Sequence, residues 1–220
     1  EYADGSADKD HKQGLDDRRE VLCFLINFIF IKSGEISQHL AELAGLFFEE
    51  AQAAYNERVA QCRAAAKLLG APAGGLLGDV PGHDRALRAS RLADPLLAAR
   101  ARFVFEEADR VLAAAAALRA GDLVQLGRLI DASHEGLRSD YEVSHPAVDA
   151  LVEAARRNGA FGARIVGAGF GGSAIALTTV ERAQELAAAL RRAGAVNAFV
   201  AQPSDGARRV EFGGAHGARK

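Results

Sequence analysis

The chain has 220 residues, 49% of them apolar, and a formal net charge of −2. This apolar content is enough for a packed core, so the composition predicts a globular protein of one large domain or two small ones. The low net charge and the dispersed Lys and Arg residues argue against nucleic-acid binding through bulk charge.

The first 50 residues divide into a polar arm and an apolar run. Residues 1–20 are rich in charge and predict a disordered or solvated arm. The apolar run 21–31 is about half as long as a bilayer-spanning helix, so it predicts a buried strand or helix. The chain begins at Glu1 and contains no Met, which indicates a fragment whose upstream residues carry part of the function.

Helical patterns fill the middle of the chain. Residues 36–70 are rich in Ala, Leu and Glu and end at a Gly, and 70–82 reads as a Gly- and Pro-rich loop. Apolar residues step by alternating fours and threes through 95–118, which places them on one face of a long helix. Gly121 ends that helix and Asp122 caps the next, so the two helices form a hairpin.

The last third of the chain changes from helical to strand periodicity. A third helix is predicted to begin near Ser144 and His145, with Pro146 at its first position, and to end at Gly159. A strand, a glycine-rich loop, a strand, a helix and a strand follow at 163–166, 167–172, 173–179, 181–193 and 196–201. This order predicts an α+β fold, in which helices cover a ferredoxin-like antiparallel sheet and the helical hairpin is an addition.

The glycine-rich loop is the most informative stretch, because Gly167, Gly169, Gly171 and Gly172 lie between two apolar segments. Glycine accepts positive φ and has no side chain, so such a loop can turn its N–H groups toward a phosphate or a crowded sugar. A tight hairpin turn explains the same pattern equally well. A strand follows instead of a helix, which excludes a dinucleotide fingerprint, and the lack of a following Lys-Ser or Lys-Thr excludes a P-loop.

Polar residues near residue 140 are expected to have structural roles. His134, Glu135 and Asp140 are residue types of metal and acid–base sites, but their spacing does not gather them on one helix face. Tyr141 is expected in core or hairpin packing, and His145 as a helix cap. No metal site is therefore predicted.

Other candidates are also interpreted without chemistry. Arg58 and Arg63 would suit a phosphate, but a solvated helix face is the preferred interpretation. Residues 205–206 form a turn signature. Cys23 and Cys62 lack metal-ligand spacing and fit free thiols in a reducing cytoplasm.

Four segments agree, in order, with one known family. They are Tyr55-Asn-Glu-Arg-Val-Ala-Gln-Cys62, Ser133-His-Glu-Gly-Leu-Arg-Ser-Asp-Tyr-Glu-Val-Ser144, Gly162-Ala-Arg-Ile-Val-Gly-Ala-Gly-Phe-Gly-Gly172 and Gln202-Pro-Ser-Asp-Gly-Ala207. From about residue 54 onward the chain resembles the C-terminal part of a galactokinase, in the GHMP small-molecule kinase superfamily. The resemblance implies an unassigned segment at 1–50 and a GHMP kinase C-terminal domain at 51–220.

The resemblance also implies a reaction and a site. A galactokinase transfers the γ-phosphoryl group of ATP, with Mg²⁺, to the anomeric hydroxyl of galactose, giving galactose 1-phosphate and ADP. Tyr55 matches the family tyrosine that borders the sugar, and 167–172 matches the loop that closes on the sugar and the transferred phosphoryl group. The implied substrate-binding residues are Tyr55, Gly167, Gly169, Phe170, Gly171 and Gly172. The implied protein is a cytoplasmic enzyme of galactose metabolism that binds galactose and ATP, not nucleic acid or a membrane.

Departures from the family pattern limit what the resemblance implies. Ala168 and Ser173 stand where many relatives have Gly and Cys, and both exchanges keep a small residue. Residues 1–50 match nothing in the family, although the ATP loop and the catalytic carboxylate are expected upstream of 51–220. We therefore expect unknown catalytic residues outside this chain, and a chain that is inactive alone.

Two alternatives stay open. The chain could be a non-catalytic sugar-binding or regulatory module, or another GHMP kinase acting on a small alcohol such as mevalonate or homoserine. Tyr55 and the segment 139–144 weigh against the second alternative. The sequence does not determine the oligomeric state or the sugar selectivity.

Overall fold

The computed structural model describes residues 21–27 and 38–201, with side chains from residue 49 onward. In chain order the elements are β1 (Val21–Asn27), α1 (Gln38–Leu68), η1 (Leu77–Asp79), α2 (Arg85–Ala89), α3 (Pro95–Ala120), α4 (Leu123–Ser139), α5 (Pro146–Arg157), β2 (Gly162–Val166), β3 (Ser173–Thr179), α6 (Val180–Arg192) and β4 (Asn197–Ala201). The strands and the helix of the last third lie within one residue of their predicted bounds. The predicted turn at 205–206 lies outside the described residues.

The strands form one antiparallel sheet in the order β2-β3-β1-β4. β1, from the first 50 residues, pairs with β3 on one side and β4 on the other, so that Leu25 lies opposite both Ile175 and Phe199. The apolar run left open between strand and helix therefore contains a strand at 21–27. This order and the helix between β3 and β4 confirm the predicted ferredoxin-like α+β fold. The domain division at residue 50 stays a prediction, and α1 runs across it.

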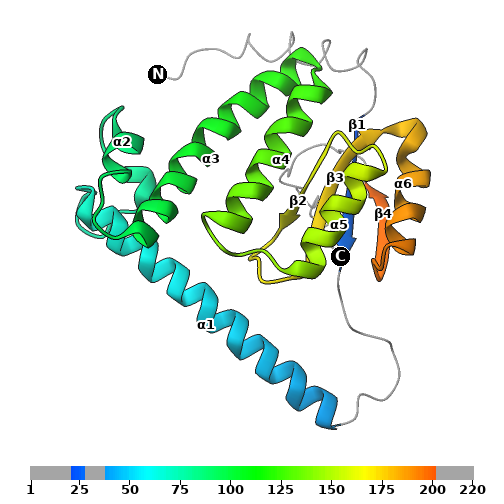
Figure 1. Cartoon of the computed structure of the whole chain (residues 1–220), viewed down its shortest axis with the longest axis horizontal. Coiled ribbons are helices and arrows are strands. Elements are labelled where there is room, and N and C mark those ends of the chain that lie inside the picture. The colour runs from blue at the N-terminus through cyan, green and yellow to red at the C-terminus, as the bar shows by residue number, and fades with distance from the viewer. Residues whose placement is uncertain (1–20, 28–37, 202–220) are drawn as a thin grey trace, which may run out of the picture.

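Helices α5 and α6 cover one face of the sheet and form the main core with it (Figure 1). Both helices are strongly amphipathic, and their inward residues Val148, Leu151, Leu186 and Leu190 are buried. The strands meet them with small residues, mainly alanines, as in the buried alternate positions Ala163, Ala174, Ala176 and Ala198. Small residues on the strands let the two helices lie close to the sheet.

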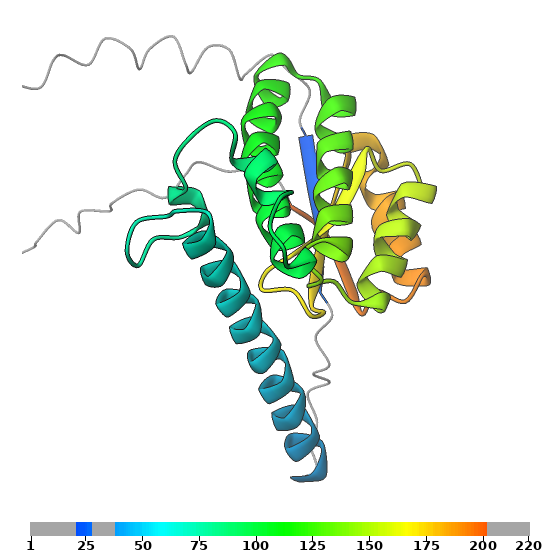
Figure 2. The same ribbon diagram turned by 60° about the vertical axis from the view of Figure 1, so that its left-hand side comes forward.

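The predicted hairpin of α3 and α4 is present, with the predicted helix end at Gly121 and the predicted cap at Asp122 (Figure 2). Asp94 accepts the N–H of Leu96 at 2.8 Å at the start of α3, and Asp122 accepts the N–H of Gln125 at 2.9 Å at the start of α4. Gly121 joins the two helices with a φ of 67°. These side chains satisfy N–H groups that a helix start leaves without partners.

Close backbone contact fixes α4 against β2. A Cβ added at Gly127 would lie 2.1 Å from the carbonyl oxygen of Phe161, and one added at Gly162 would lie 2.1 Å from the carbonyl oxygen of Gly127. Only glycine permits this approach. Within residues 21–27 and 38–201, no helix combines the length and the hydropathy needed to cross a membrane.

Candidate functional site

The glycine-rich loop is the hairpin connection between β2 and β3, since Val166 pairs with Ser173 directly before and after it. The φ angles are 93° at Gly167, 89° at Gly169, 61° at Phe170, 126° at Gly171 and 84° at Gly172. These angles lie at positive φ, which glycine adopts freely and other residues adopt at a cost of about 1–3 kcal/mol each. The hairpin interpretation is thus confirmed, and the conformation accounts for the glycines.

One side of this loop is docked on the connection between α4 and α5. The N–H of Phe170 donates to the carbonyl oxygen of Val143 at 2.6 Å. A Cβ added at Gly169 would lie 2.5 Å from the same oxygen and 2.7 Å from the Val143 Cβ. Gly169 is therefore needed for close packing as well as for its φ angle.

The other side of the loop is open. Cβ atoms built at Gly167, Gly171 and Gly172 meet no atom of the described residues within 4 Å. Backbone at these positions can therefore be approached closely by a ligand, which is the property that phosphate- and sugar-contacting loops need. In Figures 1 and 2 the loop lies at the end of the sheet that faces α1.

Two buried arginines hold the connection on which the loop is docked. Arg100, only 1% exposed, donates to the carbonyl oxygen of Asp140 at 2.5 Å and to Glu142 Oε2 at 2.5 Å. Arg58, 8% exposed, donates to the carbonyl oxygen of Glu142 at 3.0 Å. Both also donate to Gln61 Oε1, at 2.5 Å from Arg58 and 2.9 Å from Arg100.

The prediction of a solvated helix face is therefore wrong for Arg58, whereas Arg63 is exposed as expected. The burial of Arg58 could not be predicted from the sequence, because its partner in the α4–α5 connection, the backbone of Glu142, lies 84 positions away. Burial, and then the nearby charge of Arg100, lower the pKa of Arg58 from its ordinary value. Arginine keeps its charge at neutral pH even so.

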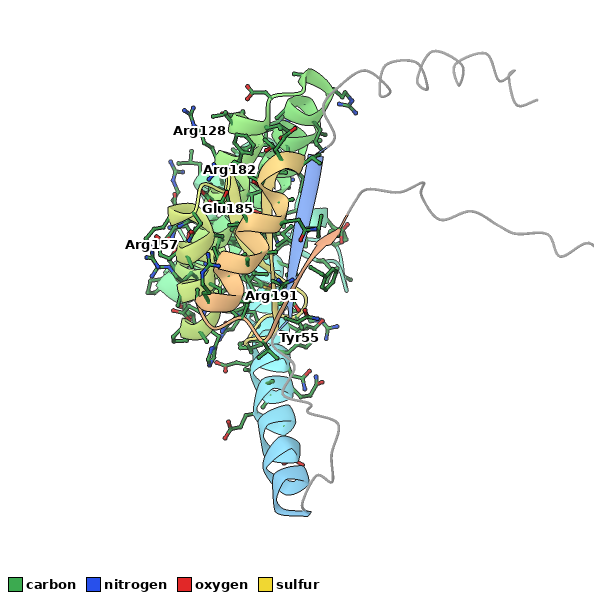
Figure 3. All side chains as sticks on the ribbon, turned by 90° about the vertical axis from the view of Figure 1, so that its right-hand side faces the viewer. Tyr55, Arg128, Arg157, Arg182, Glu185 and Arg191 are labelled. Carbon is green, nitrogen blue, oxygen red and sulfur yellow. The ribbon has the colours of Figure 1, made fainter. Side chains whose placement is uncertain are left out.

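Tyr55 lies on α1, near enough to Tyr141 of the same connection for the two phenols to interact electrostatically. Tyr141 packs on the Phe103 ring at a centroid distance of 4.8 Å, which confirms its predicted packing role, and its hydroxyl lies 3.4 Å from Cys62 Sγ. Burial, with a smaller contribution from the hydrogen bond to Cys62, raises the pKa of Tyr141, and the nearby Tyr55 phenol adds to the rise. Tyr55 itself is 46% exposed, at the end of the sheet where the glycine loop lies (Figure 3). The structure thus places Tyr55 and the loop around one connection.

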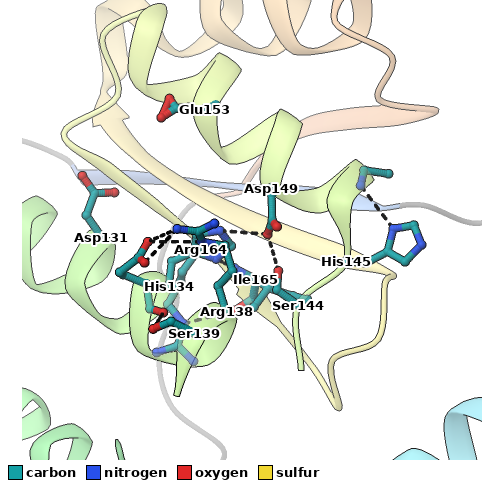
Figure 4. Close-up of polar contacts among 12 residues, drawn as sticks. Asp131, His134, Arg138, Ser139, Ser144, His145, Asp149, Glu153, Arg164 and Ile165 are labelled. Atoms are coloured by element: carbon teal, nitrogen blue, oxygen red, sulfur yellow. Dashed lines mark hydrogen bonds and ion pairs between the residues drawn. The ribbon is translucent and has the colours of Figure 1, made fainter. Parts of the chain in front are cut away.

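His134 has the structural role that the sequence predicted (Figure 4). The His134 side chain is 2% exposed, and its Nδ1 accepts a hydrogen bond from the N–H of Ile165 at 3.2 Å. Its Nε2 lies 3.3 Å from Asp149 Oδ1, and the same carboxylate oxygen accepts a hydrogen bond from the Ser144 hydroxyl. Since Nδ1 accepts a hydrogen bond, the imidazole is neutral with its proton on Nε2. Burial lowers the pKa of His134 accordingly. His145 caps α5 by accepting the N–H of Ala147 at 3.2 Å.

Metal binding by the described residues depends on the donor set that they offer. In the described ranges, no three His, Cys, Asp or Glu side chains gather in a group that could hold a metal. A Mg²⁺ ion would need carboxylate ligands from elsewhere, so no chemical step is assigned to one here. The open backbone of the glycine loop is the part that fits a ligand.

Comparison with known proteins identifies the class of this fold. Residues 114–196 match the family model described as "GHMP kinases C terminal". This match spans α4, α5, β2, β3 and α6, the elements that build and support the glycine loop. Residues 114–196 therefore match a GHMP kinase C-terminal domain, and the described structure has an α+β fold.

Within that superfamily the chain resembles the C-terminal part of galactokinases. It is 46% identical over 123 residues to the galactokinase of Mycobacterium tuberculosis (strain ATCC 25618 / H37Rv), covering 56% of this chain and 34% of that one. It is 42% identical over 171 residues to the galactokinase of Roseiflexus sp. (strain RS-1), covering 73% and 43%. The crystal structure of Lactococcus lactis galactokinase complexed with galactose superposes with a TM-score of 0.66 at 30% identity, covering 84% and 46%. The chain thus spans less than half the length of these relatives.

Proposed function

We propose that this chain forms the glycine-loop side of a galactokinase-type active site, in which ATP phosphorylates galactose to galactose 1-phosphate. One observation carries the proposal. The loop 167–172 holds four glycines at positive φ, is docked on Val143, and leaves its outer backbone open. The comparisons support a sugar kinase of the GHMP type as the setting for that loop.

The proposed roles follow from exposure and geometry. The half-exposed Tyr55 ring borders the sugar, where a phenol can both pack on a pyranose ring and hydrogen-bond to a hydroxyl. The open backbone at Gly167, Gly171 and Gly172 lies against the sugar and the transferred phosphoryl group. Gly169 and Phe170 anchor the loop. This is a positioning role, which contributes most of the catalysis in phosphoryl transfer.

Three further points belong to the proposal. ATP and Mg²⁺ are the cofactors, and their main ligands come from outside the described residues. The enzyme belongs to galactose metabolism. It works in the cytoplasm, where the thiol of Cys62, which is free, would stay reduced.

Galactose binding tests the proposal on the chain itself. In a titration of the ¹⁵N-labelled chain with galactose, we expect amide shifts at Gly167, Gly171 and Gly172. Tyr55→Ala should weaken the response at least several-fold, because the sugar loses a ring that packs on it. Gln52→Ala, an exposed change one turn earlier on α1, is the matched control and should leave the titration unchanged.

Absence of loop shifts at saturating galactose would contradict the proposed function. Shifts with mevalonate or homoserine in place of galactose would instead favour another GHMP kinase. Galactose binding by a longer form of the protein that shows no turnover would favour the non-catalytic sugar-binding module.

A further inference from the structure

Arg58 and Arg100 are buried at a cost that ordinary fold-stabilising contacts do not explain. Two guanidinium groups lie next to each other, and the charge of Arg100 lowers the pKa of Arg58. The Glu142 carboxylate contacts Arg100 at 2.5 Å, and the charges of Glu142 and Glu57 raise the pKa of Arg58 less than burial and Arg100 lower it. Burying two like charges next to each other is unfavourable, and the lowered pKa of Arg58 shows that the nearby carboxylates offset this cost only in part, so we expect the contacts of the two arginines to have a function.

Both arginines donate to the backbone of the α4–α5 connection. Arg100 binds the carbonyl oxygen of Asp140, the C-cap residue of α4, and Arg58 binds that of Glu142. Carbonyl groups at a helix end lack partners within the helix, so they are natural acceptors for a guanidinium fork. Glu142 has a φ of 52°, a conformation that a residue with a side chain adopts only when its surroundings hold it there.

The held residues lead directly to the glycine loop. Val143 follows Glu142, and its carbonyl oxygen accepts the N–H of Phe170 at 2.6 Å. The same Val143 lies against Gly169 so closely that no side chain fits between them. The position of the loop therefore depends on the position of Val143. Val143 is held by the backbone conformation at 140–142 together with the hydrogen bond from its own N–H to the Leu137 carbonyl oxygen at 2.9 Å.

We infer that Arg58 and Arg100 are positioning residues for the ligand loop 167–172. They hold the connection 140–143 in place. Through Val143 they also hold the loop in the position that contact with a bound sugar and phosphoryl group requires. The ligand part of this inference rests on the proposed function. Arginine is required because a single planar group must reach several acceptors at once, which an ammonium group does not do in the same geometry.

Amide hydrogen exchange in the ¹⁵N-labelled chain tests this inference residue by residue. Arg100→Lys and Arg58→Gln should each accelerate exchange at Phe170 by roughly tenfold or more, since its N–H loses a fixed acceptor. Exchange at Phe161 and Ala163 should not change, because their N–H groups donate to Leu177 and Asp131 in the sheet region instead. A selective change at one loop amide is a signature that a general loss of stability does not produce.

Each tested arginine has a matched control on its own helix. Arg63→Gln removes an exposed arginine from α1. Glu106→Gln alters an exposed residue of α3 that pairs with Arg110, at 3.3 Å, and not with the connection 140–143. Neither control should change exchange at Phe170.

Unchanged exchange at Phe170 in both test variants would overturn the inference, as would uniform acceleration at all amides, which would show a role in the whole fold. If the arginine variants do not fold, the Glu142→Gln variant tests the inference instead. It removes the ion pair between Glu142 and Arg100 and keeps both arginines. Faster exchange at Phe170 alone supports the inference, and no change contradicts it. The galactose titration stands apart from these measurements, so failure of the proposed function and failure of the positioning role give different results.

Discussion

At the scale of single residues, the glycines of the loop 167–172 have two different jobs. Gly169 packs against Val143, whereas Gly171 faces open space, although both have positive φ. The sequence motif does not distinguish these two roles, because the residue at each of these positions is glycine. Only the neighbours of each position in space tell packing from ligand approach.

Substitution by alanine should separate the two glycines in stability. Gly171→Ala should lower the free energy of unfolding by about 1–3 kcal/mol, because alanine rarely adopts a φ of 126°. Gly169→Ala should cost at least about 1 kcal/mol more, because its Cβ would lie 2.5 Å from the Val143 oxygen. Urea denaturation of both variants measures the difference, and equal losses would show that Val143 moves aside freely.

Protonation of His134 should make stability depend on pH. Its neutral ring accepts from Ile165, so its pKa in the folded chain is lowered from 6.5; burial is the main cause and Arg156 and Arg138 add to it, against Asp149 and Glu135. The unfolded chain therefore takes up the proton first as the pH falls. This stabilisation is complete above about pH 6.5 and is lost as the pH falls through the lower folded-state pKa.

Denaturant unfolding between pH 7.5 and 5 measures this dependence. His134→Gln removes the titrating group and should show a flatter profile across that range, although it is less stable at pH 7.5. His145→Gln is the control, since that side chain caps α5 at an exposed position and should leave the profile nearly unchanged. Parallel profiles for the wild type and His134→Gln would rule out the assignment.

At the scale of elements, local signals predicted the helices and strands well, and their buried faces less well. The caps Asp94 and Asp122 and the period change near residue 160 are local, so they can be read from neighbouring letters. The stepping pattern predicted α3 correctly, yet Val111 and Leu118 on that pattern are exposed and Arg100 is buried. Whether a segment forms a helix depends mainly on its own residues, but which face of that helix is buried depends on the elements that pack against it.

At Gly127, where α4 contacts β2, packing and helix propensity predict opposite effects of an alanine substitution on stability. Alanine is a better helix residue than glycine by about 1 kcal/mol, so propensity alone favours Gly127→Ala. Its Cβ would lie 2.1 Å from the backbone oxygen of Phe161, which must shift the sheet or the helix. We therefore expect a net loss of about 1–2 kcal/mol in unfolding free energy.

Gly136→Ala, on the same helix, is the comparison. There the nearest atom is Cδ2 of the Phe103 ring at 2.7 Å, and a side chain can move more cheaply than backbone. Thermal or urea unfolding should rank Gly136→Ala above Gly127→Ala in stability. The reverse ranking would show that α4 can slide on β2.

At the scale of the whole molecule, the described chain holds the glycine loop and spans less than half the length of the galactokinases that it resembles. Phosphoryl transfer needs a phosphate cradle, a metal ion and an oriented nucleophile together. We therefore expect the purified 220-residue chain with ATP, Mg²⁺ and galactose to release no ADP above background. A coupled ADP assay measures this, with the chain omitted as the blank, and galactose-dependent release would contradict the expectation.

The candidate site was predicted only in part from the sequence. The glycine loop and Tyr55 were named from their motifs, and the structure gathers both around the connection 140–143. The buried role of Arg58, and the part played by Val143, were missed. Their partners lie 84 and 27 positions away in the chain, and no spacing rule connects residues so far apart.

The sequence by itself determined the order of helices and strands in the last third, the helical hairpin and the position of the glycine hairpin, because periodicity, caps and turns act between near neighbours. It also carried the family resemblance, which rests on short ordered motifs. The tertiary structure alone decided that the strand at 21–27 lies between β3 and β4, and that two arginines hold the backbone beneath the glycine loop. Such pairings depend on which distant segments can bury surface and satisfy hydrogen bonds together, and that is a property of the folded chain.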